Sequence, residues 1–194
     1  MLHELGDALR AIVRLDPDLL IVLGTTLRVS VTSTLLASVA GLPLGFFLAA
    51  RTFRGKPFVL ACVRTALALP TVLIALFVYS WIARNAPLGS MNLLFTPAAI
   101  VIGQTLLIIP LVTALSYGVL HPSIRTVYEE AQLLGASNLA AFWKAIAETR
   151  VGVTAAVMTA FGRVASEIGI SLMLGGNIRG VTRTVTTAIA LETG

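Results

Sequence analysis

Three long stretches of this chain carry no charged side chain, and they constrain its fold more than any other feature. Residues 29–50, 65–83 and 85–124 contain no Asp, Glu, Lys or Arg. A bilayer-spanning helix needs about 20 mostly apolar residues, so each stretch can cross a membrane. The third stretch is too long for one span, and it begins with typical loop residues: Pro87, Gly89, Ser90 and Asn92. Its helix is therefore expected at about 93–119.

The composition excludes most soluble classes of protein. Of the 194 residues, 57% are hydrophobic and only 12% are charged, whereas soluble domains carry about 25% charged residues. A soluble enzyme, an extracellular disulfide module and a disordered chain are all excluded, and the single Cys62 cannot form an intrachain disulfide. The net charge is +5, but the basic residues are scattered between apolar runs, which argues against a nucleic-acid partner.

The start of the chain predicts an interfacial segment followed by the first span. Asp16, Pro17 and Asp18 read as a helix cap, a first-turn proline and a first-turn acid, so a helix is expected over 19–50. That helix must tilt, kink near Pro43 or protrude, because it exceeds the bilayer core. Leu2, Leu5, Leu9, Ile12 and Val13 fall on one helical face, so residues 1–18 read as an amphipathic interfacial segment.

The chain is therefore expected to be an all-α, polytopic membrane protein with one transmembrane domain over residues 19–194. Its four spans are predicted at about 19–50, 58–83, 93–119 and 151–174, with a connecting loop over 120–150. Basic residues in loops mark the cytoplasmic side. They gather in 51–64 and 120–150, so these loops are expected inside and the N-terminus outside, although Arg179 and Arg183 would then also lie outside.

Small residues recur every four positions along the first span: Ala37, Gly41, Gly45 and Ala49. Such a ridge lets helix backbones approach closely in lipid. It serves either packing within the chain or a contact between subunits.

The loop 120–150 is longer than a turn and half apolar. Val127, Ala131 and Leu134 fall on one helical face, Gly135 ends or bends that helix, and a second short helix is expected at about 138–147. From its residues alone, this helix–glycine–helix module either docks on a protein or lies as an amphipathic loop at the interface.

Two further groups are candidates for a translocation pathway. Arg163 and Glu167 stand four residues apart, so a helix would place them on one face, either as a neutralising pair or, with Ser166, facing the pathway. The Thr- and Gly-rich tail suits an oxyanion vestibule or an ordinary loop, and its candidates are Gly175, Gly176, Asn177, Thr182 and Arg183. No cofactor or metal is expected, because the two histidines, His3 and His121, lie in distant loops and no glycine-rich nucleotide loop is present.

The loop 120–150 resembles the EAA loop of ABC importer permeases. Glu129, Ala131 and Gly135 match its spacing, while Glu130 stands where alanine is usual and Ile146 is one place late. The resemblance implies that this loop couples to an ATPase subunit through Glu129, Glu130, Ala131, Gly135, Ala136 and Ser137.

Other segments resemble the type I oxyanion permeases, and tungstate permeases most of all. They include Gly41-Leu42-Pro43-Leu44-Gly45, Ala68-Leu69-Pro70, Ser166-Glu167-Ile168-Gly169 and Gly175-Gly176-Asn177-Ile178. The resemblance implies a homodimeric transport subunit of the bacterial inner membrane, not itself an enzyme. It would sit on two ATPase copies and receive an oxyanion from an extracytoplasmic binding protein. Tungstate is the expected cargo, and molybdate, sulfate or another anion is the alternative. It also implies a fifth span beyond Gly194, so a truncated chain is expected. A secondary transporter and a membrane-embedded enzyme are the rival classes.

Overall fold

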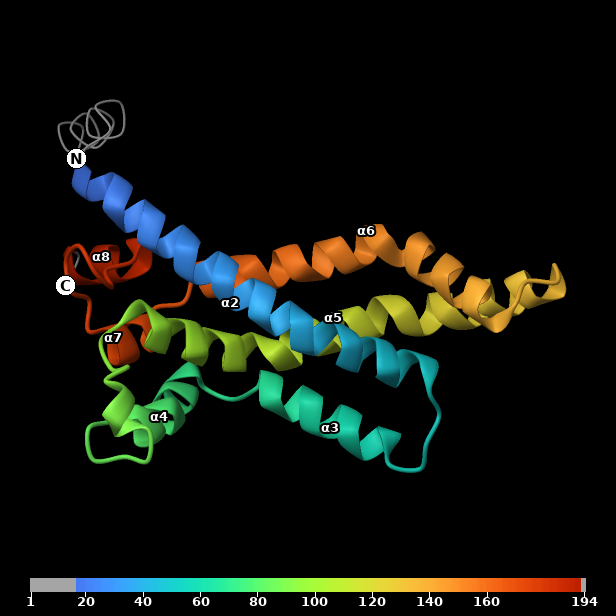
Figure 1. The fold of residues 1–194 in the computed structure, drawn as a ribbon, viewed down its shortest axis with the longest axis horizontal. Helices are drawn as coiled ribbons and strands as arrows, with labels where there is room; N and C mark the ends of the chain where they lie inside the picture. The colour runs from blue at the N-terminus through green and yellow to red at the C-terminus, as the bar shows by residue number, and fades with distance from the viewer. Residues whose placement is uncertain (1–16, 193–194) are drawn as a thin grey trace. The chain divides into compact units, whose positions relative to one another are not determined.

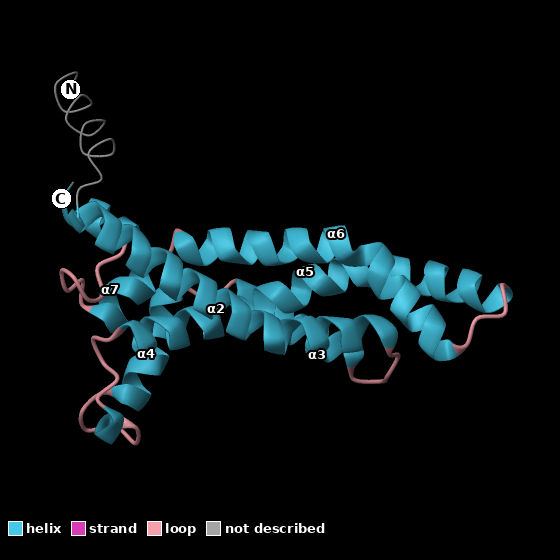
Figure 2. Cartoon of the chain, turned by 45° about the horizontal axis from the view of Figure 1, so that its top comes forward, coloured by secondary structure: helices cyan, strands magenta, loops and turns pink. Residues whose placement is uncertain are grey.

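The computed structural model describes residues 17–192, and every regular element in that range is helical (Figures 1 and 2). In chain order the elements are α2 (Pro17–Ala50), α3 (Lys56–Leu67), α4 (Thr71–Ile82), the 3-10 turn η1 (Gly89–Met91), α5 (Pro97–Leu133), α6 (Asn138–Ala165), α7 (Gly169–Gly175) and α8 (Val185–Glu192). The all-α fold class is confirmed. Asp16 and nearly all of the predicted interfacial segment lie outside the described residues.

Within residues 17–192, two helices, α2 and α5, are long and apolar enough to cross a membrane alone. Two bent helix pairs, α3 with α4 and α6 with α7, also qualify if each pair counts as one span. The chain therefore has up to four spans, which fits a polytopic membrane protein.

Two of the predicted spans are broken. The second divides into α3 and α4, which are bent by 96° at a break that contains Pro70. Proline disfavours the helical conformation of the residue before it, so a break at this point has a local cause. The fourth divides into α6 and α7, bent by 57°, and Glu167 lies in the gap. The expectation that one helix carries both Arg163 and Glu167 is therefore wrong.

The third span extends further than predicted. Helix α5 begins at Pro97, where Thr96 Oγ1 accepts a hydrogen bond from the Ala99 amide at 3.4 Å. It then continues through Pro110 and Pro122 to Leu133. The first helix of the loop 120–150 is thus the end of α5, and the second is the beginning of α6.

The chain forms two compact units. Among the described residues, the first consists of residues 17–32, 71–103 and 165–192, and the second of residues 33–70 and 104–164. In the first unit, α7 packs on α4, and the Phe95 amide donates to the Leu174 carbonyl at 2.9 Å. A Cβ on Gly103 would lie 2.7 Å from Ile170, so that glycine admits close packing with α7.

In the second unit, the small-residue ridge of α2 faces α5. A Cβ on Gly41 would lie 2.9 Å from the Cβ of Val112, and one on Gly45 would lie 2.8 Å from the Thr113 carbonyl oxygen. Ala37 is fully buried, and Ala49 is half-buried. This face of α2 therefore packs within the chain.

A buried glutamine links three helices of the second unit. Ser33 on α2 donates to Gln104 Oε1 at 3.1 Å, and Gln104 Nε2 donates to the Val164 carbonyl of α6 at 3.3 Å. Gln104 on α5 is only 2% exposed. Its amide thus satisfies polar groups on both neighbouring helices away from solvent.

Candidate coupling and translocation sites

The turn between α5 and α6 has the geometry of a Schellman motif. Gly135 adopts a φ of +82°, and the Ala136 amide donates to the Ala131 carbonyl at 2.9 Å. A six-to-one bond of this kind, closed around a left-handed glycine, satisfies a carbonyl at the end of a helix. Ser137 then caps α6, because its Oγ accepts a hydrogen bond from the Ala140 amide at 3.3 Å. The turn at residues 135–137 therefore ends α5 and caps α6.

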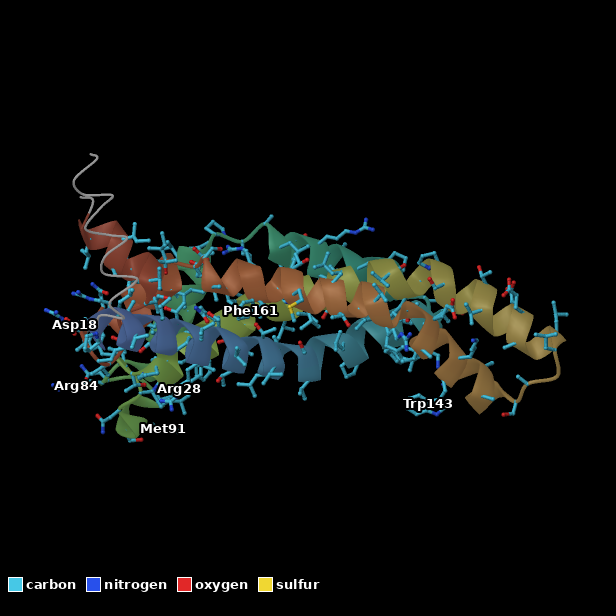
Figure 3. The ribbon with its side chains drawn as sticks, turned by 90° about the horizontal axis from the view of Figure 1, so that it is seen from above. Asp18, Arg28, Arg84, Met91, Trp143 and Phe161 are labelled. Carbon is cyan, nitrogen blue, oxygen red and sulfur yellow. The ribbon has the colours of Figure 1, made fainter. Side chains whose placement is uncertain are left out.

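The side chains around this turn are open to their surroundings. Leu133 and Leu134 are each 88% exposed, and Trp143 on α6 is 60% exposed (Figure 3). Glu129 and Glu130 are also exposed, whereas Ala131 and Ala136 are half-buried. We refer to residues 129–144 as the coupling module. It presents apolar and acidic groups together, which is typical of a surface that binds another protein.

In the break of the fourth span, Glu167 caps α7. Its Oε1 accepts hydrogen bonds from the amides of Gly169 and Ile170, at 3.1 and 3.5 Å. Its carbonyl oxygen accepts from Ser171 Oγ and Thr186 Oγ1, at 3.2 and 3.1 Å. Glu167 is 5% exposed, so its backbone and side chain both organise this buried region.

In the Thr- and Gly-rich tail, threonine hydroxyls form hydrogen bonds within the loop between α7 and α8 and to the start of α8. Thr182 Oγ1 donates to the Gly175 carbonyl at 2.5 Å and accepts from the Ile178 amide at 2.9 Å. Thr187 Oγ1 donates to Asn177 Oδ1 at 2.8 Å. Gly176 and Asn177 both adopt left-handed conformations, with φ values of 68° and 49°. These hydrogen bonds involve three of the five candidate residues of the tail: Gly175, Asn177 and Thr182.

Two hydrogen-bond donors in this loop have no acceptor. Within residues 17–192, Asn177 Nδ2 and Arg183 Nε are buried without a hydrogen-bond partner. Buried polar atoms in proteins are nearly always paired with protein, water or an ion. Both unsatisfied atoms are donors, so an acceptor such as an oxyanion would complement them.

Arginine side chains also lie on the long helices. Arg163 is exposed near the end of α6, in the second unit, while Ser166 and Glu167 belong to the first. Arg28 is exposed on α2, within the first span, and the sequence reasoning did not single it out. A charge inside a span is expensive unless it faces water or a partner, and this rule could have identified Arg28.

The loop before α8 is tied to the start of α2. Arg179 forms an ion pair with Asp18, and the Val185 amide donates to Thr26 Oγ1 at 2.9 Å. The two segments lie far apart in the sequence but belong to the same unit. The beginning of the first span and the candidate pathway loop are thus held together.

Comparison with known proteins identifies relatives of a single kind, although no family model matches. The chain is 34% identical over 184 residues to the tungstate uptake system permease protein TupB of Peptoclostridium acidaminophilum, covering 95% of this chain and 81% of that protein. It is 33% identical to a probable anion ABC transporter permease protein of Haloferax volcanii, covering 86% of this chain and 74% of the relative. TupB of Campylobacter jejuni is 37% identical over 73% of this chain and 59% of its own length.

The printed names of these relatives agree with the resemblance to oxyanion permeases seen in the sequence. ABC permeases are transport subunits rather than enzymes, and their apolar helices cross the membrane several times. The chain belongs to the permease family of anion-transporting ABC importers.

Proposed function

We propose that this chain imports tungstate as the membrane-spanning subunit of an ATP-driven transporter. The choice of tungstate as the cargo rests on the sequence identity of this chain to each kind of relative. Two permeases named for tungstate uptake are 34% and 37% identical to it, whereas those named for molybdenum transport are 27–28% identical. Molybdate, sulfate or another anion is the alternative cargo, since permeases named for molybdenum and sulfate transport also match.

ATP hydrolysis belongs, in this proposal, to a partner subunit present in two copies, which binds the coupling module. The exposed Leu133, Leu134 and Trp143 supply apolar contacts, and Glu129 and Glu130 supply negative charge for basic groups of the partner. The Schellman turn at Gly135 fixes the angle between the two helices. A fixed angle lets the module transmit ATPase closure as one rigid element.

The pathway is proposed to run past the loop between α7 and α8 and the break at Glu167. Unpaired donors on Asn177 and Arg183, together with Thr182, suit a tetrahedral oxyanion better than a cation. Arg163, Ser166, Gly175 and Gly176 complete the proposed pathway, and Arg28 is added to it.

The assembly is proposed to be a homodimer that receives its cargo from an extracytoplasmic binding protein. The N-terminus is proposed to lie outside, because the basic loop 51–64 and the loop 120–150 then lie in the cytoplasm.

Uptake measurement tests the cargo. The transporter is expressed with its ATPase and binding protein in cells that lack oxyanion importers, and cellular tungsten, molybdenum and sulfur are measured at equal external anion concentrations. We expect ATP-dependent accumulation of tungsten that a tenfold excess of sulfate does not suppress. Equal or greater accumulation of molybdenum would make molybdate the proposed cargo in place of tungstate. Uptake driven by a proton gradient without ATP would reject the importer mechanism.

A further inference from the structure

The connection after α2 forms a basic, partly apolar groove that contains none of the proposed coupling or pathway residues. Thr52, Phe53, Lys56, Pro57, Leu60, Ala61, Arg64 and Thr65 line an open groove of about 680 Å³. All of these residues lie within one continuous segment of the second unit. Two cations, two hydroxyls and four apolar side chains thus face one space.

The two cations of the groove form no ion pair with any residue of the described range 17–192. Residues 19–128 contain no Asp or Glu, and no described side chain forms an ion pair with Lys56 or Arg64. Lys56 Nζ donates to the Arg51 carbonyl at 3.3 Å and lies 5.4 Å from the centre of the Tyr117 ring. Both of these partners are uncharged, so the positive charge remains available to an anion.

The groove begins where a membrane span ends. Helix α2 stops at Ala50, the loop 51–55 reverses the chain, and α3 runs back beside α5 (Figure 1). Helix α3 has no buried residue, so part of its surface is available for contact with another molecule. Arg64 follows Lys56 by two turns, about 12 Å along the helix.

We propose that this groove binds the headgroup of an anionic phospholipid, with Lys56 and Arg64 supplying the positive charge of its lining and the upper acyl chain against Leu60 and Ala61. A bare oxyanion would satisfy the cations but leave the apolar lining uncovered, and the groove has the size of a small organic ligand rather than an ion. Basic pockets beside membrane helices recognise anionic headgroups in this way.

Native mass spectrometry of the purified full-length protein tests the proposal. The protein is taken from nanodiscs of equal parts phosphatidylglycerol and phosphatidylcholine, and bound lipids are counted. We expect the double variant Lys56→Gln/Arg64→Gln to retain at least fivefold less phosphatidylglycerol than the parent. The matched variant Arg84→Gln/Arg150→Gln removes the same charge from residues that do not line the groove and is expected to retain lipid as the parent does.

A second variant keeps every charge and fills the groove. Ala61→Trp is expected to lower phosphatidylglycerol retention by a similar factor while leaving its secondary structure intact by circular dichroism. Unchanged retention in both groove variants would overturn the proposal. So would equal retention of the two lipids by the parent, displacement of the lipid by millimolar tungstate or inorganic phosphate, or an effect of the variants that appears only with the ATPase bound.

Discussion

The amide of Ala136 donates to the carbonyl of Ala131 across a single left-handed residue, Gly135. A Cβ at Gly135 would meet no atom within 4 Å. Glycine is therefore favoured at this position by the backbone conformation and not by a lack of space. Any residue that is costly at positive φ should disturb the angle between α5 and α6 without disturbing the packing of the spans.

The first prediction concerns this turn. Gly135→Leu is expected to cost about 1–2 kcal/mol at the turn, because side chains with a Cβ disfavour left-handed φ. A membrane-inserted protein of normal abundance should remain, but ATPase co-purification or ligand-stimulated ATP hydrolysis should fall. Gly135→Asn is the control, since asparagine tolerates this conformation at helix ends. Normal assembly and normal stimulated hydrolysis in the leucine variant would remove the coupling role from Gly135.

A second prediction compares two glycines of the second unit. Gly45→Ala adds a Cβ that would collide with Ser116 and Thr113, whereas Gly118→Ala adds one in open space. Overpacking typically costs about 1–3 kcal/mol, while alanine favours a helix over glycine by about 1 kcal/mol. The Gly45 variant should therefore lose thermal stability and the Gly118 variant should keep or gain it, as measured by a thermal-shift assay in detergent. The reverse order would show that the ridge of α2 does not pack on α5.

The third prediction separates the two roles of Glu167. Glu167→Gln retains an oxygen that can accept from the Gly169 and Ile170 amides, so the protein should fold and assemble normally. Glu167→Ala loses this cap and is expected to cost about 1 kcal/mol or more. If Glu167 also faces the pathway, the glutamine variant alters tungstate uptake at unchanged protein abundance. Unaltered uptake in that variant would leave Glu167 a structural cap only.

Membrane topology gives the fourth prediction. Native Cys62 is exposed and is first replaced by alanine. A cysteine at Ser90 should then react with an impermeant maleimide in intact cells, and one at Ser137 only after permeabilisation. Both serines are exposed, so lack of reaction reports sidedness rather than burial. The opposite labelling pattern would invert the proposed orientation.

The sequence predicts best those structural features that depend on residues close together in the chain. The apolar tracts predicted the long helices, because burial in lipid demands that every backbone polar group be bonded within a helix. Gly135 was recognised as the bend of the loop because left-handed backbone strongly favours glycine. Both inferences depend on near neighbours in the chain.

Contacts between segments that are distant in the sequence are harder to predict from the sequence alone. The sequence predicts continuous helix across Glu167, because helical spacing alone cannot show that a carboxylate will cap the next helix. The partners of Asn177 and Thr182 depend on how a nine-residue loop closes, and hydroxyl-rich composition does not specify that closure. The ridge of α2 was recognised, but its partner, α5, required the structure.

The exposure of Leu133 and Leu134 bears on the fate of a newly made subunit. In the proposed orientation these two exposed leucines face the cytoplasm, and the proposed ATPase would cover them. Exposed apolar side chains are a signal by which chaperones and proteases recognise incomplete proteins. Cells that make this permease without its partner should therefore degrade it faster than the assembled transporter. The same short turn would then serve to keep the numbers of the two subunits matched.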